Sequence, residues 1–373
     1  MAGRSADGTT SPEPRPSKRL LVLAPAPPTA ASTRFRLQQF FPALRAAGVE
    51  PVLRPFLDER GFDVLYRSGR PGAKARAGAR AVVGRLSDLA RAARADAVLV
   101  HREAALVGPP LVEWAVSRLL GRPLLFDVDD AVWIPYASPT YGRALSRLLK
   151  APGKARFTLA AARQVICGNS YLAEYARRWN PRVAVVPTVV DTSVFRPAPV
   201  RNPAPVLGWI GTHSSVQYLQ AVLPALRRLA ARRRFVLRVV GAAPDAPGVP
   251  LEVVPWSLEG EVAAFQSLDV GLYPLMEDPW SLGKSGFKAV QYMACGVPPV
   301  ASPVGVVTEI VTDGENGFLA ADEDRWVDRL ERLLDDERLR RRLGERARAD
   351  AVERWSLAAH ASRFVEVVRG AFS

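Results

Sequence analysis

Both halves of the chain repeat one order of predicted elements, in which a hydrophobic strand leads through a polar loop into an amphipathic helix. In the first half, apolar runs predict strands at 19–24 and 52–57 around a helix at 34–47. In the second half, a strand at 206–210 precedes a helix at 216–233. Alternating buried strands and helices are typical of doubly wound parallel sheets, whose ligands bind at the carboxyl ends of the strands. The sequence therefore predicts an α/β fold with two such sheets.

A proline-rich connector separates the two halves, because four of the residues 196–205 are proline. Such composition is typical of extended linkers, and 373 residues are enough for two domains of ordinary size. The first 17 residues are rich in Ser, Pro, Gly and charge, which favours disorder. We therefore expect a disordered tail at 1–17, domains at 18–196 and 206–354, a linker at 197–205 and a C-terminal helix within 355–373.

The stretch 283–303 predicts a phosphate-binding site. A glycine-containing loop opens a short helix that ends at Gly296, and a buried strand follows. Phe287, Val290 and the pair 293–294 recur at helical spacing, so they should face the core. The free N–H groups and the positive dipole end of such a helix bind anions, and Lys284 and Lys288 would add two charges.

The scarcity of lysine supports a function for these two residues. Of 51 Lys and Arg residues only six are Lys, and after Lys154 the only two are Lys284 and Lys288. A compact ammonium group fits beside a phosphate where a guanidinium needs more room. The alternative is that both are solvated surface residues.

The net charge of +14 favours acidic partners such as nucleic acid, anionic lipid or nucleotide sugars, unless it only reflects compositional bias. No basic stripe is interleaved with stacking aromatics, so we expect no nucleic-acid partner. The sequence has no Gly-x-Gly-x-x-Gly motif and no Walker loop, which argues against dinucleotide dehydrogenases and P-loop enzymes.

The cellular compartment is predicted from the cysteines and the apolar runs. Cys167 and Cys295 exclude a disulfide framework and fit a reducing compartment. Residues 20–26 are too short for the apolar region of a signal peptide, and no run approaches a membrane span. We therefore expect a cytoplasmic protein.

A basic, amphipathic pattern at 138–163 predicts a helix that could lie on an anionic bilayer. The alternative is a solvated helix face. Peripheral contact with the inner face of a membrane is therefore one possible interaction of the protein.

Polar residues follow the predicted strands of the first half. Arg34 and Arg36 lie at a loop–helix junction, where they could meet an anionic acceptor or simply face solvent. His101 follows the strand 97–100. Because the carboxyl ends of parallel strands share one edge of a sheet, we expect these residues near a cleft.

Three aspartates follow the strand that begins at residue 124. Asp127 and Asp129 form an Asp-x-Asp pattern that is known as a metal motif, although three residues are a weak match. Strand alternation would put these two on one side and Asp130 on the other. The other interpretations are a cap on the next turn and a hydrogen bond to a substrate hydroxyl.

An ordered series of motifs over residues 19–360 resembles the group 1 (family four) retaining glycosyltransferases of the GT-B fold. The motifs are Gly-Trp-Ile-Gly at 208–211, Lys-x-Gly-Phe at 284–287, Gln-Tyr-Met-Ala-Cys-Gly-Val-Pro at 291–298, Ser-Pro-Val-Gly at 302–305 and Asp-Gly-Glu-Asn-Gly-Phe-Leu at 313–319. The resemblance implies two Rossmann-like domains across a cleft, with a nucleotide-sugar donor on the second and the acceptor on the first. It also implies that the last helix crosses back onto the first domain.

The sequence departs from this family at four positions. Two glutamates eight apart usually contact the donor sugar and the ribose, and here Gly283 and Gln291 stand there. Gln291 can still bind a ribose hydroxyl, whereas Gly283 offers only backbone, so Glu277 or Asp278 would have to substitute. The usual diphosphate-binding Arg and Lys are replaced by Thr212 and Gln217.

The resemblance, combined with these patterns, assigns candidate roles. Lys284, Lys288 and Asp129, the last aligned with the family's acceptor-side His, are the candidate catalytic residues. The candidate donor-binding residues are Gly211, Thr212, His213, Gly283, Ser285, Gly286, Phe287 and Gln291. The candidate acceptor-side residues are Arg34, Arg36, His101 and Asp130.

The expected activity is sugar transfer with retention from a nucleotide-diphosphate donor, without metal or cofactor. The acceptor is a glycan, a lipid-linked sugar or a small metabolite. The alternatives are an epimerase, a hydrolase, a non-catalytic donor-binding subunit, or a basic scaffold at a membrane surface.

Overall fold

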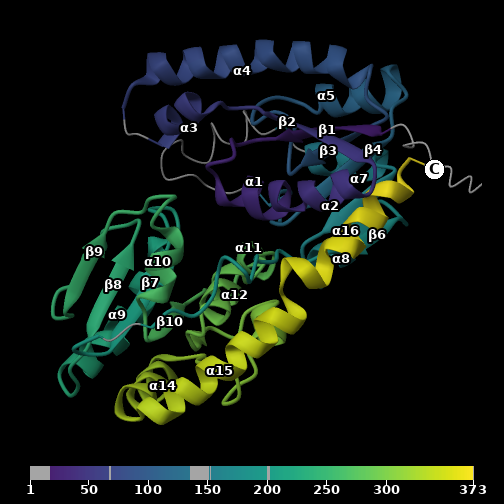
Figure 1. The fold of residues 1–373 in the computed structure, drawn as a ribbon. Helices are drawn as coiled ribbons and strands as arrows, with labels where there is room; N and C mark the ends of the chain where they lie inside the picture. Colours follow the sequence, from purple (N-terminus) through teal and green to yellow (C-terminus); the bar gives the residue numbers. More distant parts are fainter. Residues whose placement is uncertain (1–16, 67–68, 135–150, 152, 200–201, 373) are drawn as a thin grey trace, which may run out of the picture.

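Two parallel sheets of six strands each form the protein in a computed structural model that describes residues 17–66, 69–134, 151, 153–199 and 202–372 (Figure 1). The first sheet has the order β2-β1-β3-β4-β5-β6. Its strands are β1 (Lys18–Ala24), β2 (Val49–Pro55), β3 (Ala97–His101), β4 (Leu124–Val128), β5 (Gln164–Cys167) and β6 (Val183–Val185). The predicted α/β fold with two doubly wound sheets is confirmed.

The second sheet has the order β12-β11-β10-β7-β8-β9. Its strands are β7 (Val206–Ile210), β8 (Val236–Val240), β9 (Leu251–Val254), β10 (Val270–Tyr273), β11 (Pro299–Ala301) and β12 (Phe318–Leu319). The edge strand β9 is largely exposed, so it lacks the apolar run that marks a buried strand. In the sequence, the range 197–205 that was predicted as a linker falls between β6 and β7, and its exact bounds stay a prediction.

The helices of the first half differ from the prediction mainly near residue 37. They are α1 (Ala31–Arg36), η1 (Gln38–Phe40), α2 (Phe41–Ala46), α3 (Glu59–Tyr66), α4 (Pro71–Ala92), α5 (Leu111–Trp114), η2 (Ala115–Leu119), α7 (Lys154–Ala161) and α8 (Ser170–Arg177). The single helix predicted at 34–47 is broken at Leu37, and Pro42 starts a new helix because proline fits only the first turn. Of the helix predicted at 138–163, only residue 151 and the residues from 153 on are described, and of the tail predicted at 1–17 only residue 17 is described.

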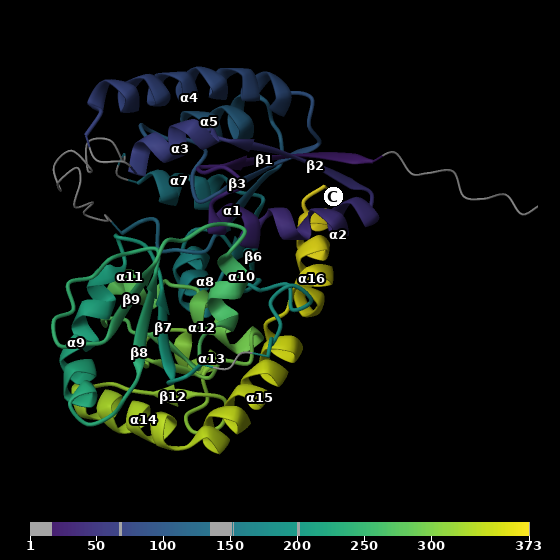
Figure 2. The same ribbon diagram turned by 60° about the vertical axis from the view of Figure 1, so that its left-hand side comes forward.

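The helices of the second half lead from the second sheet back to the first. They are α9 (Val216–Ala230), α10 (Glu261–Gln266), α11 (Pro279–Leu282), α12 (Phe287–Ala294), α13 (Val307–Ile310), α14 (Glu323–Asp335), α15 (Glu337–Arg354) and α16 (Leu357–Gly370). Figures 1 and 2 show α15 beside the second sheet and α16 rising along α2. Within the described ranges, no helix is both long and apolar enough to cross a bilayer.

Helices cover both faces of the first sheet. Buried side chains of α4, η2, α7 and α8 join one apolar cluster on one face of the sheet. Those of η1, α2 and α16 join the cluster on the other face. The buried rings of Phe364 in α16 and Phe40 stack at 4.2 Å between centroids, so the last helix completes the core of the first unit.

We predict that Phe364→Ala lowers the free energy of unfolding of the first unit by about 3–5 kcal/mol, because it leaves a cavity in this core. Urea unfolding followed by circular dichroism would measure the change. Glu366→Ala, on the exposed side of the same helix, is the control and should change stability by less than about 0.5 kcal/mol. An equal effect of both variants would contradict the packing role of α16.

Candidate functional site

The N-terminus of α12 is open. Gly286 has φ of +65°, and a Cβ there would lie 2.3 Å from Ile310 Cδ1, so only glycine fits this turn. No side chain caps the helix, and within the described residues the amide N–H groups of Ser285, Gly286, Phe287 and Lys288 have no hydrogen-bond acceptor. The helix is anchored by Val290 and its neighbours in the core. This leaves the donors that an anion would use.

The two lysines lie beside this helix start. Lys284 Nζ lies 5.5 Å from the ring centroid of Tyr218 and 5.9 Å from that of Trp280, in the range of cation–π contacts. Lys288 Nζ donates to Gln291 Oε1 at 3.1 Å and lies 5.2 Å from the Phe265 ring. Burial lowers the pKa of Lys288 to about 8, so its charge lacks full compensation.

Gln291 is fully buried one turn after Lys288. Its Oε1 accepts from Lys288, while its Nε2 has no partner among the described residues. A buried unpaired amide donor is costly, so this site is suited to a ligand that brings an acceptor.

The loop after β7 lies at the same edge of the second sheet as the start of α12. A Cβ at Gly211 would lie 2.4 Å from the Trp209 ring, which keeps this turn tight. Thr212 N donates to Ser215 Oγ at 3.0 Å, and His213 is exposed. Tyr218 on α9 accepts from Ser281 Oγ at 3.3 Å, so this loop and the Lys284 loop meet at α11.

A buried network occupies the carboxyl ends of β3 and β4 in the first sheet. Asp127 accepts from Arg36 Nε at 3.3 Å, from Arg36 Nη2, and from His101 Nδ1 at 2.7 Å. Arg36 Nη1 also donates to Val186 O at 2.7 Å. Burial alone would raise the pKa of Asp127, but Arg36 and His101 outweigh burial and lower it. Arg36 therefore lies behind the site, and it acts on a ligand only through Asp127 and His101.

His101 has one ring nitrogen in this network and one that is unused. Nδ1 lies 2.7 Å from Asp127 Oδ2 and, where it carries a proton, donates to that carboxylate. Nε2 is buried, lies 3.8 Å from Asp129 Oδ1, and has no hydrogen-bond partner among the described residues.

Arg102 joins the other two aspartates, and sequence reasoning missed it. Its Nε donates to Asp129 Oδ1 at 2.6 Å, and its Nη2 lies 2.8 Å from Asp129 Oδ2 and 2.6 Å from Asp130 Oδ2. Arg102 has φ of +57°, which is uncommon for a non-glycine residue and typical of functional sites. One signal for Arg102 is present in the sequence, because Arg102 is the first residue after β3. Asp129 is likewise the first residue after β4.

The pKa values of Asp129 and Asp130 are shifted in opposite directions. Burial raises the pKa of Asp129, but Arg102 and His101 outweigh burial, so the pKa is lowered. Burial and the neighbouring charge of Asp129 raise the pKa of Asp130 more than Arg102 lowers it. The three aspartates are thus paired with cations, and within the described residues no group of three His, Cys, Asp or Glu side chains is arranged to hold a metal ion.

The loop at residue 283 contacts the first unit. Asn169 Nδ2 donates to Gly283 O at 3.2 Å and to Lys284 O at 3.1 Å, while its Oδ1 caps α8. A Cβ at Gly283 would lie 2.7 Å from Ala131 Cβ and 3.0 Å from Ala131 N. Position 283 therefore has no room for a side chain. The predicted substitutes do not point there, because Asp278 caps α11 through Ser281 N at 2.9 Å and Glu277 is exposed.

Further polar contacts join the two units around this loop. Arg34 Nη2 forms an ion pair with Glu261 Oε2 at 2.8 Å, so Arg34 faces the second unit. Ser170 Oγ donates to Glu309 Oε1 at 3.2 Å. Asp130 interacts electrostatically with Lys284, which brings the network of the first sheet next to the open helix of the second.

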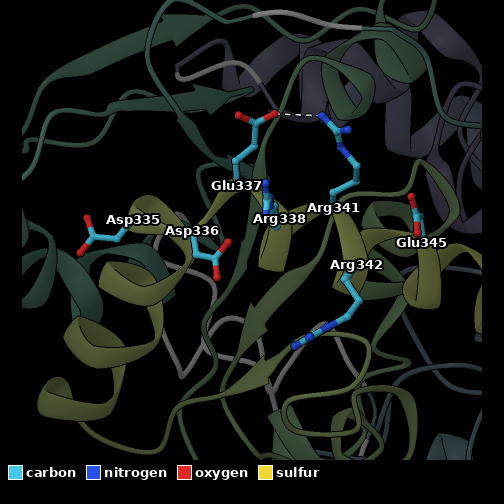
Figure 3. A pocket seen from close by; sticks show the side chains of 7 residues that line it. All are labelled: Asp335, Asp336, Glu337, Arg338, Arg341, Arg342 and Glu345. Carbon is cyan, nitrogen blue, oxygen red and sulfur yellow. Dashed lines mark hydrogen bonds and ion pairs between the residues drawn. The ribbon is translucent and has the colours of Figure 1, made fainter.

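A surface hollow at the start of α15 is a poor candidate for the site. Figure 3 shows its lining, which is Asp335, Asp336, Glu337, Arg338, Arg341, Arg342 and Glu345. Glu337 and Arg341 pair with each other at 2.9 Å and are mostly exposed. The hollow lies at the junction of α14 and α15, away from the contact between the two sheets (Figures 1 and 2).

Comparison with known proteins confirms the resemblance. Residues 204–336 match the family described as Glycosyl transferases group 1. The MMP alpha-(1->4)-mannosyltransferase of Mycolicibacterium hassiacum is 33% identical over 204 residues, 51% of this chain and 48% of the relative. The D-inositol 3-phosphate glycosyltransferase of an Arthrobacter species is 25% identical over 266 residues, 62% of this chain and 61% of the relative. In each case the matched part spans less than two thirds of the relative's length.

Solved structures share the whole fold. Anabaena HepE, crystallised with UDP and glucose, superposes with a TM-score of 0.69 at 15% identity, over 95% of this chain and 100% of that chain. Sucrose-phosphate synthase from Thermosynechococcus elongatus has a TM-score of 0.69 at 18% identity, over 95% and 99% of the two chains. The architecture is therefore GT-B, with two Rossmann-like units.

We predict that Gly283→Ala lowers kcat/KM for the reaction proposed below by about tenfold or more, because the added Cβ pushes the loop away from Ala131 and misplaces the bound donor. Steady-state kinetics would measure the change. Gly370→Ala is the control, since a Cβ there meets nothing within 4 Å. Unchanged kinetics in Gly283→Ala would show that the close contact has no part in the activity.

Proposed function

We propose that the protein is a glycosyltransferase that moves a sugar from a nucleotide-diphosphate donor to an acceptor hydroxyl, with retention and without a metal or cofactor. The observation that carries this proposal is the open start of α12, with Lys284 and Lys288 beside it, next to the Asp129 network of the first sheet. The match of residues 204–336 to group 1 glycosyltransferases supports it.

The donor site is assigned to the second unit. The free amides of residues 285–288 and the two lysines would bind the diphosphate. The unpaired Gln291 Nε2 would donate to a ribose hydroxyl oxygen. The bound UDP in the related HepE structure agrees with a nucleotide-sugar donor. The loop at 211–213, including exposed His213, would border the same ligand.

The acceptor side is assigned to the first unit. Asp129 would orient the acceptor or the transferred sugar by accepting a hydroxyl hydrogen bond, while Arg102 holds its carboxylate in place. His101 Nε2 would accept a second hydrogen bond from a sugar hydroxyl. The acceptor class remains a glycan, a lipid-linked sugar or a small metabolite.

The reaction separates charge at the anomeric carbon. The bond from this carbon to the diphosphate oxygen breaks, the acceptor oxygen forms the new bond on the same face, and the acceptor proton passes to the leaving phosphate. Negative charge grows on the diphosphate, so Lys284, Lys288 and the helix amides stabilise the transition state more than the ground state. Contact between the two units would exclude water, which otherwise hydrolyses the donor.

A second candidate is a protein of this fold that binds the donor without transferring its sugar, such as an epimerase, a hydrolase or a partner subunit. The close approach of Gly283 to Ala131 favours this second candidate. It leaves no room at position 283 for the sugar-contacting carboxylate that the family resemblance implies there. Product analysis with and without acceptors separates the candidates. Binding of nucleotide sugars in calorimetry, with no new glycoside from any acceptor, would replace the transferase proposal by this one.

We predict that Lys288→Gln lowers kcat/KM by about 100-fold, because it removes a charge that stabilises the leaving diphosphate. In the unmodified protein, the affinity for a nucleoside diphosphate should fall as the pH rises through about 8, where Lys288 loses its proton. The Lys288→Gln variant should bind weakly at all of these pH values. Lys18→Gln, an exchange at an exposed lysine, is the control. A Lys288→Gln variant with the parent's rate would exclude the role.

We predict that the activity persists in a chelator such as EDTA. Arg36 and His101 already contact the Asp127 carboxylate, and Arg102 contacts that of Asp129, so a cation would have to displace these partners. The assay compares rates with EDTA, and with EDTA plus excess Mg²⁺ or Mn²⁺. Complete loss of activity that either metal restores would reinstate a metal site at Asp127 and Asp129.

A further inference from the structure

The outward face of α4 carries apolar and basic residues without acidic ones. The exposed positions include Val82, Val83 and Leu86, together with Arg76 and Arg80. The helix has a single acid, Asp88, which is buried and paired with Arg85 at 2.7 Å and Arg54 at 2.8 Å. The inward side of α4 packs on the first sheet, so this outward stripe faces away from it.

The neighbouring helices α5 and η2 extend this face. Leu111, Trp114 and Leu119 are exposed there, and Arg118 lies between them. The only acid, Glu113, is buried and accepts from Ala104 N at 3.0 Å. The elements η2 and α4 are in contact, and both pack inward on the same face of the sheet, so their outer sides form one surface. We call it the α4–η2 face.

The α4–η2 face has two properties that rarely occur together on a solvated surface. Its six large apolar side chains are 46% to 69% exposed, namely Val82, Val83, Leu86, Leu111, Trp114 and Leu119. Three of its arginines are in none of the ion pairs formed by the described residues, namely Arg76, Arg80 and Arg118. Exposed hydrophobic groups beside uncompensated cations fit an anionic apolar surface.

Helix α15 shows what a solvated basic helix looks like in this protein. It also carries many arginines, but Glu337, Glu345 and Glu353 are exposed among them. Arg341 pairs with Glu337 at 2.9 Å. A biased arginine content alone therefore does not explain the missing acids on the α4–η2 face.

We propose that the α4–η2 face docks on an anionic lipid bilayer. The arginines would lie among the lipid phosphates, Trp114 at the headgroup level, and the aliphatic side chains at the start of the acyl region. In Figures 1 and 2, α4 lies at the end of the first unit farthest from the second sheet, so a docked bilayer leaves the contact between the units accessible. This surface differs from the predicted one at 138–163, and it does not depend on the proposed reaction.

Co-sedimentation with vesicles tests the proposal on the full chain. The vesicles are phosphatidylcholine alone, or phosphatidylcholine with about a third phosphatidylglycerol. The unmodified protein should bind the anionic vesicles, bind the neutral ones weakly, and dissociate as salt rises. Arg76→Gln/Arg80→Gln should lower the partition coefficient by at least about tenfold, since each basic residue contributes about fivefold. Leu86→Ser/Trp114→Ser should reduce binding without changing the net charge.

The matched control removes the same charge from another exposed helix. Arg338→Gln/Arg342→Gln in α15 should bind vesicles within about twofold of the parent. Three outcomes would overturn the proposal. They are no binding of the parent protein to anionic vesicles, equal loss in the two double arginine variants, and a dimer in analytical ultracentrifugation that Leu86→Ser/Trp114→Ser dissociates.

Discussion

The ion pair between Arg36 and Asp127, fully removed from water, sets the arrangement at the end of the first sheet. Removing one partner of such a pair costs about 3–5 kcal/mol, because the remaining charge is left buried and uncompensated. Asp127 also contacts His101 Nδ1 at 2.7 Å, which leaves His101 Nε2 pointing toward Asp129, with 3.8 Å to Asp129 Oδ1. A pair that lies behind the carboxyl ends of β3 and β4 thus fixes the orientation of the His101 ring.

Opposite charge patterns meet at the contact between the two units. The first unit brings three aspartates held by Arg36 and Arg102, and the second brings two lysines beside a helix N-terminus. The carboxylates are neutralised locally by arginine, so they do not repel an anionic ligand as free carboxylates would. The lysines lie against aromatic rings and are in none of the ion pairs of the described residues, although Asp130 acts on Lys284 and Glu261 on Lys288 at longer range. This division suits a ligand with an anionic end and a hydroxyl-rich end.

Much of the fold was predictable because the two sheets are built from apolar strands at regular spacing. The loop at 283–288 was predictable as well, since glycines and lysines were placed before a helical pattern. The break of the predicted helix at Leu37 was missed because the apolar residues keep their helical spacing across it. Pro42, which starts the next helix, does not change that spacing. The contacts of Arg102 and Asn169 were missed because they depend on partners 27 and 114 residues away, Asp129 and Gly283, although Asn169 was correctly expected as a cap of α8. Arg36 was predicted near the site, but its complete burial follows only from the tertiary packing.

The hydrogen bonds from Asn169 to the backbone of the Gly283 loop have a thermodynamic consequence. One side chain of the first unit holds the carbonyl groups of the loop that leads into α12 of the second. A ligand on either unit that favours this contact also favours the geometry that the other unit's ligand uses. By linkage, each ligand then changes the affinity for the other by the same factor. Through these hydrogen bonds of Asn169, binding at one unit would be coupled to binding at the other.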